Sequence, residues 1–159
     1  MTAVRGGVVR RGSVVAVLCG VALSVGVPAE AAPAGGRFGG CHQGSVLTGE
    51  RVPGTGSAGQ TVRRRGEVWE CASSLLPGVV SGRFRAELPW LSFGTVTSGA
   101  FEWSDGSVST VAGLPNTLWQ ITAGPAEGHV LRFDLVSEMN GDWYYTDNAM
   151  AILGVTFVS

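Results

Sequence analysis

Residues 83–88 read Arg-Phe-Arg-Ala-Glu-Leu and alternate strictly between charged and apolar side chains. Successive side chains of an extended strand point to opposite faces of a sheet. The pattern therefore places Phe84, Ala86 and Leu88 on a buried face and the three charges on a solvated face. It predicts a half-buried β-strand, the kind that covers one side of a core in an antiparallel sheet.

A hairpin is predicted shortly after this strand. Residues 95–103 end in Phe-Glu-Trp, which puts Trp103 on the apolar face, and Asp105 and Gly106 stand before a second β-prone segment at 107–111. Asp-Gly between two such segments indicates a hairpin turn, because Gly adopts the positive φ that the turn requires. The Asp105 side chain is expected to bond its own backbone there. Trp103, Asp105 and Gly106 thus form a predicted turn motif.

The rest of the chain repeats this plan of short β-prone segments separated by Gly, Pro, Asn or Asp. Residues 118–123 and 129–137 predict a second hairpin, and residues 149–158 are apolar on both faces, which is typical of a central strand. No segment has a helical period over ten residues. We therefore expect an all-β fold, a single antiparallel β-barrel or β-sandwich domain, with the barrel preferred because closure leaves no exposed strand edge.

The N-terminal segment has the order of a secretory signal peptide. Residues 1–12 carry three Arg and no acid, about fifteen mostly apolar residues follow, and residues 29–31, Ala-Glu-Ala, fit signal peptidase. The apolar run is shorter than the roughly 20 residues that a membrane-spanning helix needs. We expect residues 1–31 to be a cleaved signal segment. Residues 32–159 should then form a single secreted, extracellular β-domain, free of the membrane, with a flexible N-terminal tail at 32–40.

Two cysteines lie beyond the signal segment, Cys41 and Cys71. Thiols oxidise outside the cell, so these two are expected to form a disulfide. Closing a loop of about 31 residues would stabilise the fold by roughly 3.5 kcal/mol in the chain-entropy model. A zinc site would need further Cys or His at close spacing, so no metal and no cofactor is expected.

The net charge of the chain beyond the signal segment bears on which class of partner it can bind. Beyond residue 31 the chain has eight Arg against eleven Asp and Glu, a formal net charge of −3. Nucleic-acid binders usually carry a basic surplus, so no nucleic-acid partner is expected. With 45% hydrophobic and only 14% charged residues, the chain also differs from disordered proteins. A monomer is the expected state.

Two short motifs have plain structural interpretations. Residues 54–59 match the pattern GxGxxG, but no buried strand precedes them and no helix follows, so they predict a flexible loop and not a dinucleotide site. Residues 63–65 are three consecutive Arg. We expect them to form a solvated edge, with the gripping of a polyanion as the alternative.

Aromatic residues and one histidine supply the candidate binding residues. The five Trp of the chain could all fill the core of a small β-domain. Alternatively, Trp143 with Tyr144 or Tyr145 forms an exposed stacking platform of the kind that sugar-binding modules use. His129 opens a predicted strand, so its ring either caps the core or acts as a general base at the mouth of a barrel. Trp143, Tyr144, Tyr145 and His129 are therefore the binding candidates.

Residues 103–110, Trp-Ser-Asp-Gly-Ser-Val-Ser-Thr, resemble the W-S-D/N-G-x-x-S-T hairpin of a group of short secreted β-rich proteins of actinobacteria. The resemblance extends over roughly residues 70–136, and it includes Cys71 and the Gly-rich hairpin that leads into residues 130–133. It implies an extracellular β-domain of unknown function and supplies no catalytic residues.

The residue pattern favours binding over catalysis. The chain has no Gly-x-Ser-x-Gly elbow and only two His, so no catalytic constellation is recognisable and no catalytic residue is assigned. We expect a non-catalytic binding module for an extracellular glycan or protein. One alternative is a small secreted hydrolase that uses His129 and a carboxylate. Another is an inhibitor or toxin-like ligand of a secreted protein that presents the hairpin at Asp105-Gly106.

Overall fold

The structure is a computed structural model of the chain, and it describes residues 38–93, 95, 97–115, 117–136 and 144–158. All of them belong to the unit Ala32–Ser159, the second of two into which the chain divides. A short 3-10 turn, η1 (Ser57–Gly59), and nine β-strands are found among them. The strands are β1 (Gly39–Gly44), β2 (Val46–Pro53), β3 (Gln60–Ser73), β4 (Ser81–Pro89), β5 (Ser98–Trp103), β6 (Val108–Gly113), β7 (Leu118–Ala123), β8 (Val130–Leu135) and β9 (Met150–Val158).

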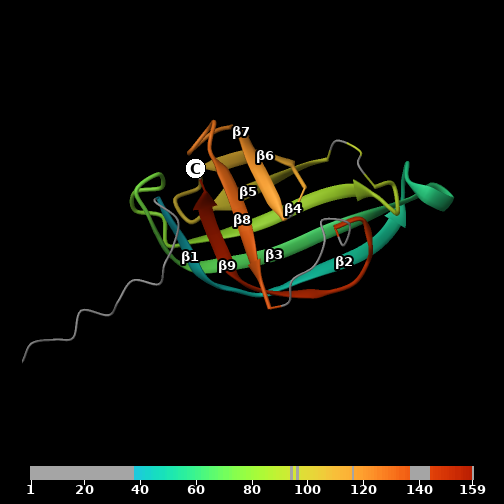
Figure 1. Ribbon diagram of the computed structural model, residues 1–159, viewed down its shortest axis with the longest axis horizontal. Coiled ribbons are helices and arrows are strands. Elements are labelled where there is room, and N and C mark those ends of the chain that lie inside the picture. The colour runs from blue at the N-terminus through green and yellow to red at the C-terminus, as the bar shows by residue number, and fades with distance from the viewer. Residues whose placement is uncertain (1–37, 94, 96, 116, 137–143, 159) are drawn as a thin grey trace, which may run out of the picture. The chain divides into compact units, whose positions relative to one another are not determined.

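The strands close into an antiparallel barrel (Figure 1). From β3 to β9 each strand pairs with the next along the chain. β1 and β2 together complete the circle, because each of them pairs with β3 on one side and with β9 on the other. Counted as one position, they make the barrel eight-stranded. The expected all-β fold is therefore confirmed, and the barrel, not the sandwich, is its architecture.

A one-residue irregularity at Ser45 separates β1 from β2. Gly44 lies opposite Val68 and Thr48 lies opposite Arg65, so four steps on one strand face three on the other. This is the count of a β-bulge. The Ser45 hydroxyl accepts a hydrogen bond from the Glu67 backbone N–H at 2.8 Å, and the Ser45 N–H donates to the Glu67 carbonyl. The bulge lets one long segment follow the bend of the barrel.

The hairpin predicted at Asp105-Gly106 is present. Gly106 has a φ of +84°, and the Trp103 N–H donates to the Ser107 carbonyl across the turn. The Ser107 hydroxyl and N–H both donate to Asp105 Oδ1, at 2.6 and 2.9 Å. These two hydrogen bonds hold the pKa of the Asp105 carboxyl below its usual range. Trp103 itself points inward, stacked on Phe101 with ring centroids 4.8 Å apart.

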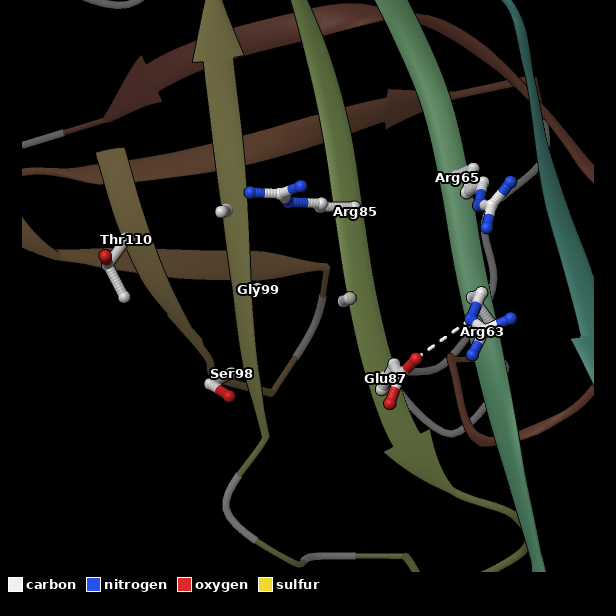
Figure 2. Close-up of a pocket in the computed structure, with 9 residues that line it drawn as sticks. Arg63, Arg65, Arg85, Glu87, Ser98, Gly99 and Thr110 are labelled. Atoms are coloured by element: carbon white, nitrogen blue, oxygen red, sulfur yellow. Dashed lines mark hydrogen bonds and ion pairs between the residues drawn. The ribbon is translucent and has the colours of Figure 1, made fainter. Parts of the chain in front are cut away.

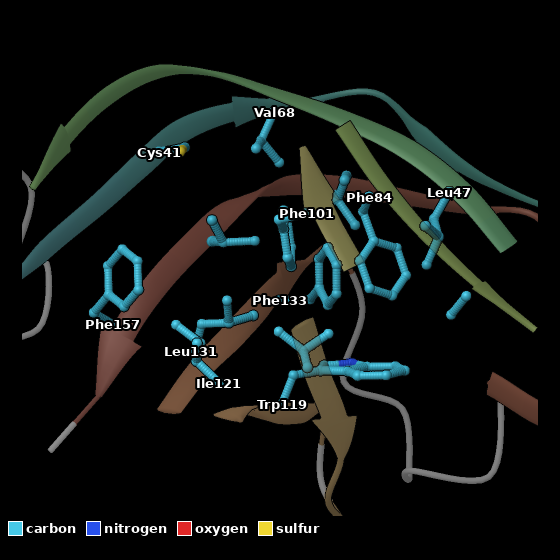
Figure 3. Packing of buried hydrophobic residues seen from close by; sticks show 14 of the residues in the cluster. Cys41, Leu47, Val68, Phe84, Phe101, Trp119, Ile121, Leu131, Phe133 and Phe157 are labelled. Carbon is cyan, nitrogen blue, oxygen red and sulfur yellow. The ribbon is translucent and has the colours of Figure 1, made fainter. Parts of the chain in front are cut away.

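Aromatic side chains fill the barrel interior (Figure 3). Phe84 on β4 lies at the centre of this cluster, with ring centroids 5.0 Å from those of Phe101, Phe133 and Trp119. The strict alternation predicted for residues 83–88 is confirmed, because the apolar members of β4 are buried and the charged members are exposed. The inside of the barrel is thus a packed core, so the outer surface and the loops are the places where a ligand could bind.

Two predicted boundaries and one burial pattern differ from the structure. The predicted tail extends to residue 40, but β1 already begins at Gly39. The strand predicted to begin at residue 95 is β5, which begins at Ser98. β9 is not covered on both faces, since Leu153 is 56% exposed. The reason is the barrel, whose outer face has no second layer over it. The predicted loop at residues 54–59 is confirmed as the connection that contains η1.

Candidate functional site

The three consecutive Arg of β3 divide between the two faces of the barrel wall. Arg63 and Arg65 lie on the outer face, whereas Arg64 is completely buried in the interior with Val62 and Val68. Strand alternation dictates this division. The prediction of a solvated edge is therefore right for two of the three residues and wrong for Arg64.

Arg64 fastens the segment 144–148 to the barrel. Its guanidinium donates to the backbone carbonyls of Tyr144 at 3.3 Å, Thr146 at 2.5 Å and Asn148 at 2.5 Å. Burial lowers the pKa of Arg64 to about 10, although the nearby charge of Asp147 acts in the opposite direction and raises it. Because this pKa is still well above 7, the guanidinium stays protonated at neutral pH. Arg64 is accordingly a structural residue that holds this segment in place.

The outer face carries a pair of arginines without carboxylate partners. Arg65 on β3 and Arg85 on β4 are direct register partners, and both are exposed. Among the described residues, no carboxylate lies within 4.0 Å of either guanidinium. By contrast, Arg63 pairs with Glu87 at 2.8 Å, and Arg83 pairs with Glu67 at 3.2 Å. Like charges directly opposite each other on a sheet are destabilising, so this pair is not explained by the stability of the fold.

Two hollows flank the Arg65–Arg85 pair, and both arginines line both of them. The first, of about 440 Å³, extends over β5, where Figure 2 shows Arg85 reaching toward that strand and Arg63 bonded to Glu87. The second, of about 450 Å³, extends toward Thr48 on β2. Both volumes are in the range of small-ligand sites. We call these residues the arginine groove: Arg65, Arg85, Thr48, Ser98, Gly99, Ala100 and Thr110.

The groove is hollow because small side chains stand beside long ones. Across the strands, Arg85 lies opposite Ala100, and Ala100 lies opposite Thr110. A methyl group between a guanidinium and a hydroxyl leaves open space above the sheet. The hydroxyls of Ser98 and Thr110 border that space. The groove therefore offers two positive charges and three hydroxyls to a ligand on the outer face. The hollows are also lined by three carboxylates, those of Glu67, Glu87 and Glu102, and the first two of these are paired with Arg83 and Arg63.

The predicted aromatic platform is not formed by Tyr144. Its side chain is 3% exposed and packs edge-on against Trp119, with ring centroids 5.2 Å apart. Burial raises the pKa of its hydroxyl. Tyr145 is half-buried, donates its hydroxyl proton to the Thr95 carbonyl at 2.8 Å and contacts Phe93 edge-on. Trp143 lies outside the described residues. Tyr144 is thus a core residue, because segment 144–148 folds inward onto Arg64.

His129 lies immediately before β8, in the turn from β7. Its Nδ1 is 3.2 Å from the Ala126 carbonyl oxygen and 3.3 Å from that of Glu127, and Phe38 packs edge-on against its ring. A proton on Nδ1 can be donated to these carbonyls. In the described part of the chain, no carboxylate hydrogen-bonds to this ring. The described residues therefore show the His129 ring held by two backbone carbonyls, and they supply no carboxylate partner for it.

The other predicted residues have structural places. Cys41 and Cys71 form the expected disulfide and are register partners on β1 and β3. Trp103 and Trp119 are core residues, as one interpretation of the aromatic surplus predicted, whereas Trp69 is partly exposed. Within the ranges that the structure describes, no group of three or more His, Cys, Asp or Glu could hold a metal ion.

Sequence reasoning gave the gripping of a polyanion by residues 63–65 only as an alternative, and it did not find Arg85 or the groove. Its signal is present in the sequence as Arg at alternate positions of two predicted strands, residues 63–65 and 83–85. Which Arg faces which depends on the β3–β4 register, and that register places Arg65 opposite Arg85.

No family model, no curated protein and no solved structure matches the chain. In the portion of the chain with described coordinates, no helix combines the length and the apolar character that crossing a membrane requires.

Proposed function

We propose that the chain is a secreted, non-catalytic binding module that holds an anionic ligand in the arginine groove. The observation that carries this proposal is the exposed register pair Arg65–Arg85, which has no carboxylate within 4.0 Å among the described residues. Export after removal of residues 1–31 is part of the proposal. It is supported by the signal-like sequence, by the disulfide, which suits an oxidising environment, and by the resemblance of residues 103–110 to short secreted proteins.

Guanidinium chemistry explains why this pair suits an anion. Each planar guanidinium offers parallel N–H donors that match the two oxygens of a carboxylate or the oxygens of a sulfate or phosphate. Two such groups on adjacent strands repel each other in the free protein. A bound anion relieves that repulsion and receives charge-assisted hydrogen bonds from both.

Neutralising both arginines should weaken ligand binding strongly without harming the fold. We expect Arg65→Gln/Arg85→Gln to weaken binding of a tricarboxylate probe, tri-galacturonate, by at least about 30-fold, because a hydrogen bond to a charged group contributes about 1.5–3 kcal/mol. The free energy of unfolding should stay equal or rise by a few tenths of a kcal/mol, since a like-charge pair is removed. Isothermal titration calorimetry and urea unfolding measure the two effects.

Arg132→Gln is the matched control for this experiment. Arg132 also lies on the outer face, but on β8, where it pairs with Asp134 at 3.0 Å. It loses one positive charge, where the double variant loses two, at a site four strands away from β4. We expect its affinity for the probe to stay within about 2-fold of the parental value, as long-range charge effects are screened in physiological salt. Equal weakening by this control, or unchanged binding by the double variant, would contradict the proposed site.

A further inference from the structure

We infer that the ligand of the arginine groove is an acidic oligosaccharide of the uronate type, which lies across the strands and not along them. This inference rests on the proposed function and adds the chemical class of the ligand and its direction on the barrel. It follows from the distribution of charges and hydroxyls around Arg65 and Arg85.

One row of register partners crosses the outer face without an acidic residue. Its members lie side by side on β2, β3, β4, β5 and β6. Neighbouring strands are about 4.8 Å apart, so the row is about 19 Å long. It presents two charges at adjacent positions, a methyl group beside them and a hydroxyl at each end. In order, the row is Thr48, Arg65, Arg85, Ala100 and Thr110.

The rows on either side of it contain carboxylates. On one side Arg63 stands between Glu50 and Glu87, and on the other side Arg83 stands between Glu67 and Glu102. An anionic chain that ran along β3 or β4 would have to pass these carboxylates, and like charges repel. A ligand of high, uniform negative charge, such as a polyphosphate, is disfavoured for the same reason. The groove suits a ligand whose single anionic groups are spaced by neutral, hydroxyl-bearing parts, with one or two of those groups on the arginines.

Hydroxyls stand where those neutral parts would lie. Ser98 and Thr110 line the hollow next to Arg85, and Thr48 lines the hollow next to Arg65. A hydroxyl both donates and accepts, so it pairs with the hydroxyls of a sugar ring. A uronate carries such hydroxyls on the same ring as its carboxylate. An acidic peptide side chain carries its carboxylate on CH₂ groups, which gain nothing from Ser98 or Thr110.

Three probes of matched size separate these ligands. Tri-galacturonate carries three carboxylates on hydroxyl-bearing rings, its fully methyl-esterified form keeps the rings without the charges, and N-acetyl-triglutamate amide keeps three carboxylates without the rings. Calorimetric titration of the disulfide-bonded protein should show tri-galacturonate binding at least about 10-fold more tightly than either of the others.

Removal of the two hydroxyls gives the sharper readout. Ser98→Ala/Thr110→Val should lower the affinity for tri-galacturonate by about 3- to 10-fold, because neutral hydrogen bonds are lost. The affinity for triglutamate should change by less than about 2-fold. Both positions are exposed on strands, and Thr110→Val keeps the β-branched shape, so thermal unfolding should be unchanged.

The possible results distinguish a failure of the uronate inference from a failure of the proposed function. If triglutamate binds as tightly as tri-galacturonate, or if the hydroxyl variant weakens both equally, the uronate inference is overturned while an anion site at Arg65 and Arg85 stands. Preference for inorganic tripolyphosphate over tri-galacturonate also overturns it. If the methyl ester binds as tightly as the acid, or if no anionic probe binds, the proposed function itself fails.

Discussion

Arg64→Ala is expected to lower the free energy of unfolding by about 3–5 kcal/mol, because it removes the donor of three backbone carbonyls and opens a cavity inside the barrel. The carbonyls belong to Tyr144, Thr146 and Asn148, and the Arg64 side chain that donates to them is completely buried. Urea unfolding followed by tryptophan fluorescence measures the change, since Trp119 packs against Tyr144 of the same segment.

Two further variants separate packing from hydrogen bonding in this result. Arg65→Ala makes the same chemical change one residue away on the exposed face, and it should alter the free energy of unfolding by less than about 0.5 kcal/mol. Arg64→Met keeps most of the buried volume but removes the hydrogen-bond donors. Its loss of unfolding free energy should therefore lie between that of Arg64→Ala and that of Arg65→Ala. An Arg64→Ala protein as stable as Arg65→Ala would show that Arg64 does not fasten segment 144–148.

The disulfide should have an effect of similar size. Replacing Cys41 and Cys71 together by Ala is expected to cost about 3.5 kcal/mol, because the unfolded chain regains the freedom of a loop of about 31 residues. For a domain of this size the loss corresponds to a melting temperature lower by about 10–15 °C. The two residues join β1 to β3, which are paired neighbours in the barrel. Differential scanning calorimetry of oxidised protein gives the reference.

Reduction of the parental protein provides the independent control for this prediction. Treated with a thiol reductant, the parental protein should melt near the temperature of the double variant, whereas the variant should not respond to the reductant. A parental melting temperature that reduction leaves unchanged would mean that the Cys41–Cys71 bond is not a source of stability.

Local signals in the sequence predicted much of the fold. The alternation of residues 83–88 needs only the two-residue period of a strand, and Asp105-Gly106 needs only the φ of Gly, so both could be predicted without tertiary information. The Cys41–Cys71 pair followed from the count of cysteines beyond the signal segment. Barrel closure was favoured by a general argument about edges, and the pairing of β9 with β1 and β2 confirms it.

The site depended on information that the sequence does not carry locally. Tyr144 looked available for stacking because an aromatic pair stood after a turn, yet a buried cation far away in the chain, Arg64, draws the segment inward. Arg65 and Arg85 are 20 residues apart, and only the register of β3 against β4 shows that they face each other while Arg63 faces a carboxylate. Charge counting could not have found them, because the domain is acidic as a whole.

The central claim is that Arg65 and Arg85 together hold an anion, and side-chain NMR of the arginines tests it most directly. In a protein labelled with ¹⁵N-arginine, titration with tri-galacturonate should shift the Nε–H signals of Arg65 and Arg85 saturably and with one common affinity. The signal of Arg132, on the outer face of β8, should stay in place. Saturable shifts at Arg132 with none at Arg65 and Arg85, or no shift at any arginine at millimolar probe, would contradict the account.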